Sequence, residues 1–224
     1  MRIKTLPIFL AFLCMGFGDA VGPFVGLAKQ KFALSNTVAQ LIQFMGFIMF
    51  GILSIPMGIF QDKKGKKFIL MLGLLIALLG LIIPILGGLS SFGMFLLTVL
   101  LLGAGATTLQ VAGNPIMRDV SAEGSYSRNL SLGQFVKAIG SLTGPVIPAV
   151  AASYFNTDWI ILFPIYSAFL LLTLVTVGML NIEESKPADK TASFSSCFEL
   201  LKDKYILMLV LGIFLYVGAE QSMS

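Results

Sequence analysis

The stretch Gly58-Ile59-Phe60-Gln61-Asp62-Lys63-Lys64-Gly65-Lys66-Lys67 decides how this chain must fold. It holds four lysines and one aspartate, and a long apolar run flanks it on each side. Hydrocarbon cannot accommodate a charged cluster of this density, so we expect a tight loop between two membrane-spanning helices. Short loops that are rich in lysine remain in the cytoplasm, which predicts the side on which this loop lies.

The whole chain has the composition of a polytopic membrane protein. It is 57% hydrophobic and 12% charged, with a mean hydropathy of +0.93 and a formal net charge of +4. A soluble domain would carry about twice this charged fraction. The basic residues lie where membrane topology requires them, so the charge indicates a lipid bilayer as partner and no nucleic acid.

The residue types that are missing exclude several kinds of chemistry. The sequence contains no histidine, which removes His-based metal sites and Ser/His or Cys/His catalysis. Cys14 lies in an apolar run and Cys197 in a polar one, so they do not form a recognisable disulfide or metal pair. No nucleophile–base pair is evident either. We therefore expect no cofactor, no metal and no enzymatic activity.

Six apolar runs predict six membrane-spanning helices, at about residues 6–27, 38–60, 68–86, 92–115, 129–154 and 159–180. Residues 181–204 form the long polar segment, which we interpret as a cytoplasmic linker between two bundles. Residues 205–224 then begin a seventh helix. The predicted fold is an all-α membrane protein, with a six-helix N-terminal bundle in residues 1–180 and a truncated seventh helix. A C-terminal bundle is missing, so we expect either a fragment or the product of an interrupted gene.

The distribution of basic residues supports this topology, with a cytoplasmic N-terminus. Twelve of the fifteen lysines and arginines fall on the predicted inner side: Arg2, Lys4, Lys63, Lys64, Lys66, Lys67, Arg118, Arg128, Lys186, Lys190, Lys202 and Lys204. Lys29 and Lys31 fall outside, and Lys137 lies within a span.

The spacing Gly-x-x-x-Asp-Lys-x-Gly-Lys-Lys resembles the loop between the second and third helices of the major facilitator superfamily, and it lies between the second and third apolar runs here. An ordinary basic loop would explain the lysines but not the aspartate or the two glycines. We expect five of its residues to form a cytoplasmic gate rather than a substrate site: Gly58, Asp62, Gly65, Lys66 and Lys67.

Further stretches resemble one branch of the superfamily, the fucose–galactose–glucose:proton symporters. They are residues 32–43 at the entry to helix 2, Asn114-Pro115 in helix 4, Leu132-Gly133-Gln134 in helix 5 and residues 216–220 in helix 7. The resemblance implies uptake of a neutral monosaccharide together with protons. It also implies that two bundles rock around a site at the midplane, and that the home of the protein is a bacterial cytoplasmic membrane.

The chain departs from this family at positions that the resemblance marks as functional. Gln110 stands where the family carries an acid on helix 4, and Lys137 replaces an asparagine on helix 5. The family's acid on helix 1 would fall at Gly22, whereas here Asp19 stands about one turn earlier. Gln134 matches the family's glutamine. The sugar-binding residues are thus partly kept, and the expected proton carrier is absent.

Ionisable residues within the spans are the first candidates for function, because a membrane interior penalises an unpaired charge. Asp19 lies roughly 20 Å and Lys137 roughly 13 Å from the cytoplasmic ends of their helices, so both can reach a central cavity. We predict that Lys137 pairs with Asp19 or with Glu220, and that proton or substrate binding breaks the pair. Asp19 and Glu220 are the candidate proton carriers. The alternative is a permanent structural ion pair or a snorkelling lysine.

Four amide side chains and Lys137 are the candidates for contact with sugar. The amides belong to Gln43, Gln110, Asn114 and Gln134, and they can both donate to and accept from hydroxyls. The alternative for each amide is a hydrogen bond between helices. For Asn114 it is a cap at the helix end before Pro115.

The leading interpretation is therefore a proton-coupled sugar transporter that works by alternating access. An uncoupled facilitator or a carrier of another small solute is the nearest alternative, because Gln110 replaces the family's acid. An inactive half-transporter is an alternative of a different class, and an intramembrane enzyme is the least supported. Accumulation of sugar driven by a pH gradient would distinguish the symporter from the facilitator.

Overall fold

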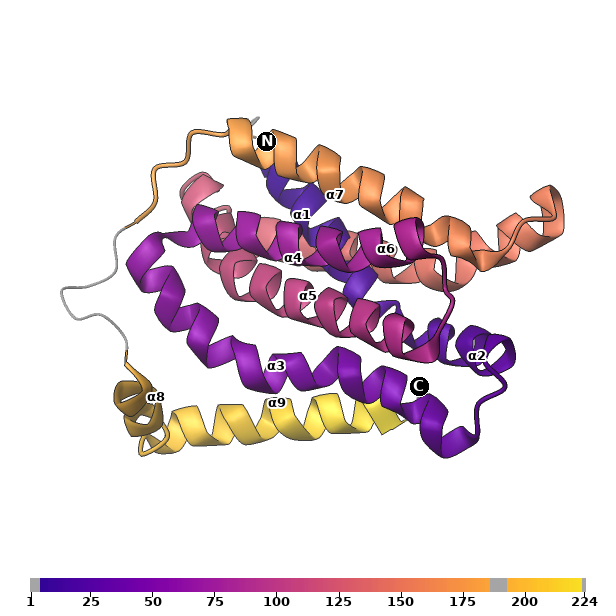
Figure 1. Cartoon of the computed structure of the whole chain (residues 1–224). Coiled ribbons are helices and arrows are strands. Elements are labelled where there is room, and N and C mark those ends of the chain that lie inside the picture. The colour runs from indigo at the N-terminus through magenta and orange to yellow at the C-terminus, as the bar shows by residue number, and fades with distance from the viewer. Residues whose placement is uncertain (1–4, 186–192, 223–224) are drawn as a thin grey trace. The chain divides into compact units, whose positions relative to one another are not determined.

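The computed structural model describes residues 5–185 and 193–222, which are almost entirely helical and contain no strand (Figure 1). The chain divides into two compact units, Met1–Lys186 and Pro187–Ser224. Arg2, Lys4, Lys186 and Lys190, which contribute to the predicted charge topology, lie outside the described residues.

The first unit contains seven α-helices and one short 3₁₀ helix in its described part. They are α1 (Thr5–Asp19), α2 (Val21–Lys31), α3 (Asn36–Lys64), α4 (Lys66–Gly87), α5 (Phe92–Val120), α6 (Tyr126–Phe155), η1 (Trp159–Ile161) and α7 (Leu162–Met179). The described part of the second unit contains α8 (Phe194–Leu200) and α9 (Lys204–Ser222). Within the described residues, five helices are long and apolar enough to cross a membrane, or six if α1 and α2 form one bent span. The predicted all-α membrane fold is confirmed.

The first predicted span is wrong in one respect, because it is broken rather than continuous. α1 ends at Asp19, α2 begins at Val21, and their axes differ by 40°. Pro23 accounts for the break, since its ring would clash with the carbonyl of Asp19 four residues earlier in a continuous helix. The break leaves the Asp19 carboxylate at the C-terminal end of α1.

Two other predicted boundaries are also wrong. α5 runs through Pro115 to Val120, so Asn114 lies inside a helix and does not cap its end. The tight loop predicted between residues 60 and 68 is shorter than expected, because α3 continues to Lys64 and α4 starts at Lys66. Gly65 alone separates the two helices, with a φ of 94° that a glycine adopts without strain.

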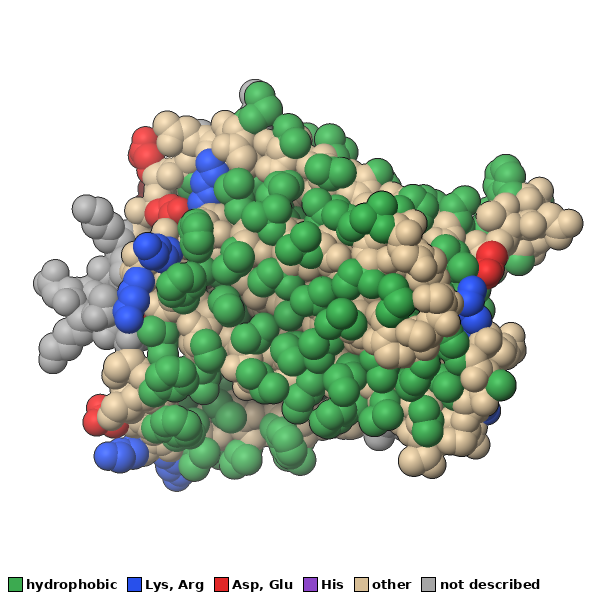
Figure 2. All heavy atoms as spheres, viewed as in Figure 1, with side chains coloured by type: hydrophobic (Ala, Val, Ile, Leu, Met, Phe, Trp, Pro, Cys, Tyr) green, Lys and Arg blue, Asp and Glu red, His purple; other side chains and the backbone are tan. Residues whose placement is uncertain are grey.

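α5 makes extensive contacts with α1, α3 and α4, and α1 also packs against α6 and α7. Ile8, Phe12 and Phe17 of α1 are almost completely buried, and the Phe17 ring stacks on Tyr166 with 3.9 Å between the centroids. On the face drawn in Figure 2, apolar side chains cover the middle of the helices and charged side chains gather near their ends. This is the pattern expected of helices whose middle portions contact lipid.

Glycines bring α1 and α6 into direct backbone contact. A Cβ atom at Gly16 would lie 2.2 Å from the carbonyl oxygen of Lys137, and one at Gly140 would lie 2.3 Å from that of Leu13. No side chain fits at either position, and small residues are what allow membrane helices to approach so closely. The contact fixes the height of α6 relative to the end of α1, and therefore the height of Lys137 relative to Asp19.

Candidate functional site

An ion pair joins the end of α1 to α6 inside the apolar bundle. The Lys137 Nζ lies 2.8 Å from Asp19 Oδ2, and it also donates a hydrogen bond to Gln110 Oε1 of α5 at 3.0 Å. The lysine side chain is 18% exposed and the aspartate side chain 29%. The predicted pairing of Lys137 with Asp19 is present, and Gln110 is an additional partner. The functional role of the pair stays a prediction.

The local backbone explains why these two charges meet. The carboxylate of Asp19 stands at the negative end of the α1 dipole, where an anion is unfavourable unless a cation is close. Lys137 provides that cation from the next helix. Ser141 lies one turn further along α6. Its hydroxyl is 3.3 Å from both Gly16 O and Lys137 O, and it can donate a hydrogen bond to either. The hydroxyl thus links the two helices beside the ion pair, a role that the sequence does not indicate.

A second polar contact lies one turn away, between the same two helices α5 and α6. Gln134 Nε2 lies 3.4 Å from Asn114 Oδ1, which is a long hydrogen bond. Asn114 follows Gln110 by four residues, and Gln134 precedes Lys137 by three, so each pair shares one helix face. The Gln134 side chain is exposed and Asn114 is half-buried. Five predicted residues thus form one polar cluster, which comprises Asp19, Gln110, Asn114, Gln134 and Lys137.

Of the remaining predicted residues, Gln43 lies apart from this polar cluster. Gln43 is half-buried on α3 and faces the backbone of α2, because its Nε2 would lie 4.0 Å from a Cβ atom at Gly22. The position at which the resemblance places an acid therefore faces Gln43 rather than Lys137. Glu220 falls within α9 of the second unit, but its side chain lies outside the described residues.

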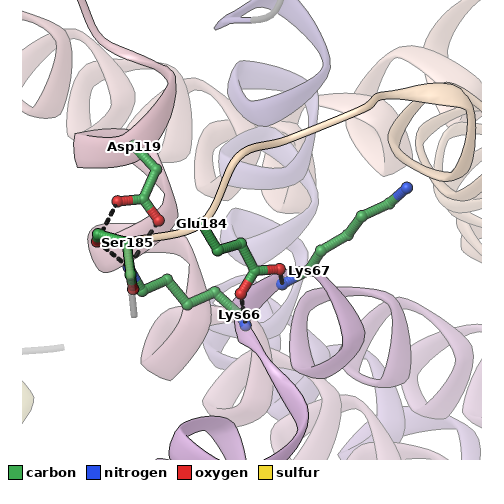
Figure 3. A network of polar contacts seen from close by, with 5 residues as sticks. All are labelled: Lys66, Lys67, Asp119, Glu184 and Ser185. Carbon is green, nitrogen blue, oxygen red and sulfur yellow. Dashed lines mark hydrogen bonds and ion pairs between the residues drawn. The ribbon is translucent and has the colours of Figure 1, made fainter. Parts of the chain in front are cut away.

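A second network of charges lies at the junction of α3 and α4, where the gate was predicted (Figure 3). The Lys66 Nζ contacts Asp119 Oδ2 at 2.6 Å, and the side chain of Asp119 at the end of α5 is only 3% exposed. Ser185 Oγ donates to Asp119 Oδ1 at 2.7 Å and also lies 2.8 Å from Lys66 Nζ. The segment that follows α7 is therefore held against both α4 and α5.

Glu184 caps the first turn of α4 with its carboxylate. Its two oxygens accept hydrogen bonds from the backbone nitrogens of Lys66 at 2.5 Å and Lys67 at 2.9 Å, and Figure 3 shows them from close by. Such a contact satisfies free N–H groups and places an anion at the positive end of the helix dipole. A Cβ atom at Gly65 would come within 2.9 Å of Glu184 Oε2, which gives Gly65 a second reason to be glycine.

The Lys67 side chain also contacts the segment that follows α7 at this junction. Its Nζ donates to the carbonyl oxygens of Gly178 at 2.8 Å and Leu180 at 2.6 Å, at the C-terminal end of α7. A cation is favourable at this end of a helix. Gly58 differs, because a Cβ atom there would meet no atom within 4 Å, and Asp62 lies near the end of α3. The gating role of the stretch stays a prediction.

Asp119, Glu184 and Ser185 were not among the residues predicted from the sequence. The available signal was an acid directly after the last apolar turn of α5 and another directly after α7, both at the predicted cytoplasmic side. Opposite charges at the same membrane surface as four lysines are natural partners for them. Within the described residues, no group of three or more acidic or cysteine side chains is placed to hold a metal ion.

Replacing Glu184 with alanine should lower the stability of the bundle. The loss of a capping side chain costs about 1 kcal/mol, which we expect to measure as a lower melting temperature of the detergent-solubilised protein. Glu183→Ala is the matched control, because the neighbouring Glu183 is exposed and the structure gives it no contact in this network. Equal melting temperatures for the two variants would contradict the capping role.

Comparison with known proteins identifies a family with this architecture. The sequence profile of the Major Facilitator Superfamily matches residues 8–224. A glucose/galactose transporter of Brucella abortus is 28% identical over 210 residues, which cover 88% of this chain and 50% of the relative. A putative glucose/galactose transporter of Helicobacter pylori is 28% identical over 233 residues, covering 93% and 55%. The L-fucose-proton symporter of Escherichia coli is 26% identical over 223 residues, covering 86% and 51%. The chain thus spans about half the length of these relatives.

Solved structures give the same fold. The crystal structure of the Escherichia coli fucose:proton symporter superposes with a TM-score of 0.73 at 22% identity, covering 98% of this chain and 60% of that chain. A peptide transporter superposes with a TM-score of 0.61 at 14% identity. The profile match extends over nearly the whole chain, and the described helices adopt the corresponding fold. On this basis the chain belongs to the Major Facilitator Superfamily.

Proposed function

We propose that this chain forms the first six-helix bundle of a secondary transporter that takes up a neutral monosaccharide together with protons. The observation that carries the proposal is the polar cluster at the break between α1 and α2. There an ion pair and three amide side chains lie together within apolar, membrane-length helices. Polar groups in a span are costly and mark substrate or proton pathways. The names of the relatives, glucose/galactose transporter and L-fucose-proton symporter, favour a sugar as the solute.

The amides supply the chemistry that a sugar needs. Each carboxamide offers donors and an acceptor, and a sugar hydroxyl both donates and accepts. The 3.4 Å contact between Gln134 and Asn114 is long, so exchanging it for a hydrogen bond to a hydroxyl group costs little. Gln134 is also the exposed member of the cluster, which makes it the first contact for an arriving sugar.

The ion pair supplies a means of coupling. Protonation of Asp19 removes its negative charge, which releases the Lys137 ammonium to donate to substrate while it keeps its hydrogen bond to Gln110. Glu220 is the second candidate proton carrier, from the seventh helix. In this mechanism the bundle of residues 1–180 rocks against a second bundle that starts at residue 205, with residues 181–204 as the cytoplasmic linker. The network of Lys66, Asp119 and Glu184 serves the cytoplasmic gate.

This mechanism also assigns an orientation. We place the protein in a bacterial cytoplasmic membrane, with its N-terminus and the junction of α3 and α4 in the cytoplasm. The four lysines of that junction carry the assignment, because lysine-rich short connections are retained on the inner side.

Uptake measurements on cells that express the protein from its natural gene test the proposal. Cells without their own uptake systems are given labelled glucose, galactose or fucose, with and without an inward pH gradient. We expect one of these sugars to accumulate only when the outside is more acidic. Equilibration without accumulation would indicate a facilitator, and no uptake of any of the three would indicate an inactive bundle. Either of these results overturns the proposal.

Replacing Gln134 with alanine should raise the KM for the transported sugar by about tenfold, since a site built to hydrogen-bond a hydroxyl loses affinity when one partner is removed. The expression level and melting temperature should stay unchanged, because the side chain is exposed. Ser131→Ala is the control, since Ser131 lies one turn away on α6 and donates to Ser127 O of its own helix. An unchanged KM in the Gln134 variant would remove this residue from the sugar site.

A further inference from the structure

The short helix α8 gathers most of its apolar side chains on one side. At 100° per residue, Phe194, Cys197, Phe198 and Leu201 fall on one side of the helix, Ser195 and Glu199 fall on the opposite side, and Leu200 falls beside them. Phe194 is 55% exposed and Phe198 is 62% exposed. Two exposed phenylalanines on one face of a helix are costly in water, so this face requires an apolar environment.

This helix is a separate element and not the first turn of α9. A capping box starts it, in which Ser196 N donates to Ser193 Oγ at 3.2 Å and Ser193 N donates to Ser196 Oγ at 2.9 Å. Asp203 then starts α9, where its carboxylate accepts from Tyr205 N at 2.8 Å. Figure 1 shows α8 turned away from the axis of α9. The sequence therefore ends α8, turns the chain, and begins α9 as a separate helix.

The connection to α9 determines where α8 can lie. Only Leu201, Lys202 and Asp203 separate the two helices, so the end of α8 lies within roughly 14 Å of the start of α9. α9 contains the apolar stretch Lys204–Ala219, which the proposed function interprets as the start of a membrane-spanning helix. Under that interpretation, the three-residue connection keeps α8 close to the membrane surface.

We propose that α8 lies in the membrane surface, with Phe194, Phe198 and Leu201 inserted among the lipids at the level of the headgroups. Its polar residues Ser195 and Glu199 then face water. Lys202 and Lys204 are exposed directly beside this face, and they suit the anionic headgroups of a bacterial membrane. The occupant of the apolar face is therefore the bilayer. This surface role is independent of the solute that is transported.

A fluorescent label at Cys197 tests this proposal directly, because this cysteine lies on the apolar face. The protein is labelled with an environment-sensitive nitrobenzoxadiazole group and reconstituted into vesicles of phosphatidylcholine and phosphatidylglycerol. The matched control is Ser195→Cys combined with Cys197→Ser, which moves the label to the opposite face without changing its depth along the helix. Cys14 is buried at 3% exposure, and Cys197→Ser alone reports any labelling there.

We expect the label at Cys197 to be quenched by lipids that carry a doxyl group near the headgroup, and to be at least about twofold less accessible to aqueous iodide than the label at position 195. Equal iodide access at both positions would place α8 in water and overturn the proposal. Protection from iodide without doxyl quenching would place the apolar face against protein, which also overturns it. Neither result depends on whether sugar is transported.

Discussion

Replacing Lys137 with alanine should reduce sugar uptake by at least about tenfold, because the change leaves the Asp19 charge without a partner inside a membrane span. The side chain also donates to Gln110, so its removal disturbs the polar cluster on two of its helices. The measurement is the initial rate of uptake, normalised to the amount of folded protein, across a range of external pH. Uptake equal to that of the unaltered protein at every pH would contradict a functional ion pair.

Two further variants separate function from structure. Lys31→Ala removes an ion pair with Asp158 whose atoms lie 3.7 Å apart and whose side chains are 29% and 56% exposed. Such a surface pair contributes little, so we expect uptake to be unchanged. The double variant Asp19→Asn with Lys137→Gln removes both charges and should fold. If it still accumulates sugar, the pair is a permanent structural contact and Asp19 does not carry the coupled proton.

Replacing Gly140 with alanine should destabilise the bundle strongly. The added Cβ would lie 2.3 Å from the carbonyl oxygen of Leu13, and backbone atoms cannot move aside as a flexible side chain can. Overpacking of this kind costs about 1–3 kcal/mol or more. Forcing α6 away from α1 also separates Lys137 from Asp19. We therefore expect a lower melting temperature and the loss of uptake together.

The control for this substitution is Gly51→Ala, in the middle of α3. A Cβ atom at Gly51 would meet no atom within 4 Å, so this change adds a methyl group without a clash. Alanine is the better helix former, and the melting temperature should stay the same or rise slightly. A Gly140→Ala protein that melts like the Gly51→Ala protein would contradict the close contact of α1 with α6.

The sequence predicts the fold well because membrane spans are encoded locally, in runs of apolar residues. It predicts helix ends less well. Proline is tolerated inside membrane helices, so Pro115 does not end α5, whereas Pro23 does separate α1 from α2. The residues next to each proline do not tell the two cases apart, so their different effects depend on the surrounding structure. Gly65 likewise reverses the chain in a single residue, where the sequence predicts a longer loop.

The polar cluster is predictable to the extent that unpaired charges are excluded from lipid. That rule limits the partner of Lys137 to Asp19 or Glu220, and the structure shows the contact with Asp19. The partners of Lys66 are not predictable in this way, because Asp119 and Glu184 lie in polar segments where an acid needs no special explanation. Their roles depend on contacts between residues far apart in the sequence.

Equilibrium binding of a labelled sugar to the purified product of the natural gene tests the central claim most directly. We predict saturable binding of glucose, galactose or fucose that is weakened in Gln134→Ala and in Lys137→Ala, and retained in Ser131→Ala. Such a result would place the sugar at the polar cluster between α1, α5 and α6. The claim is contradicted if none of the three sugars binds saturably, or if the Gln134 and Lys137 variants bind as tightly as the unaltered protein.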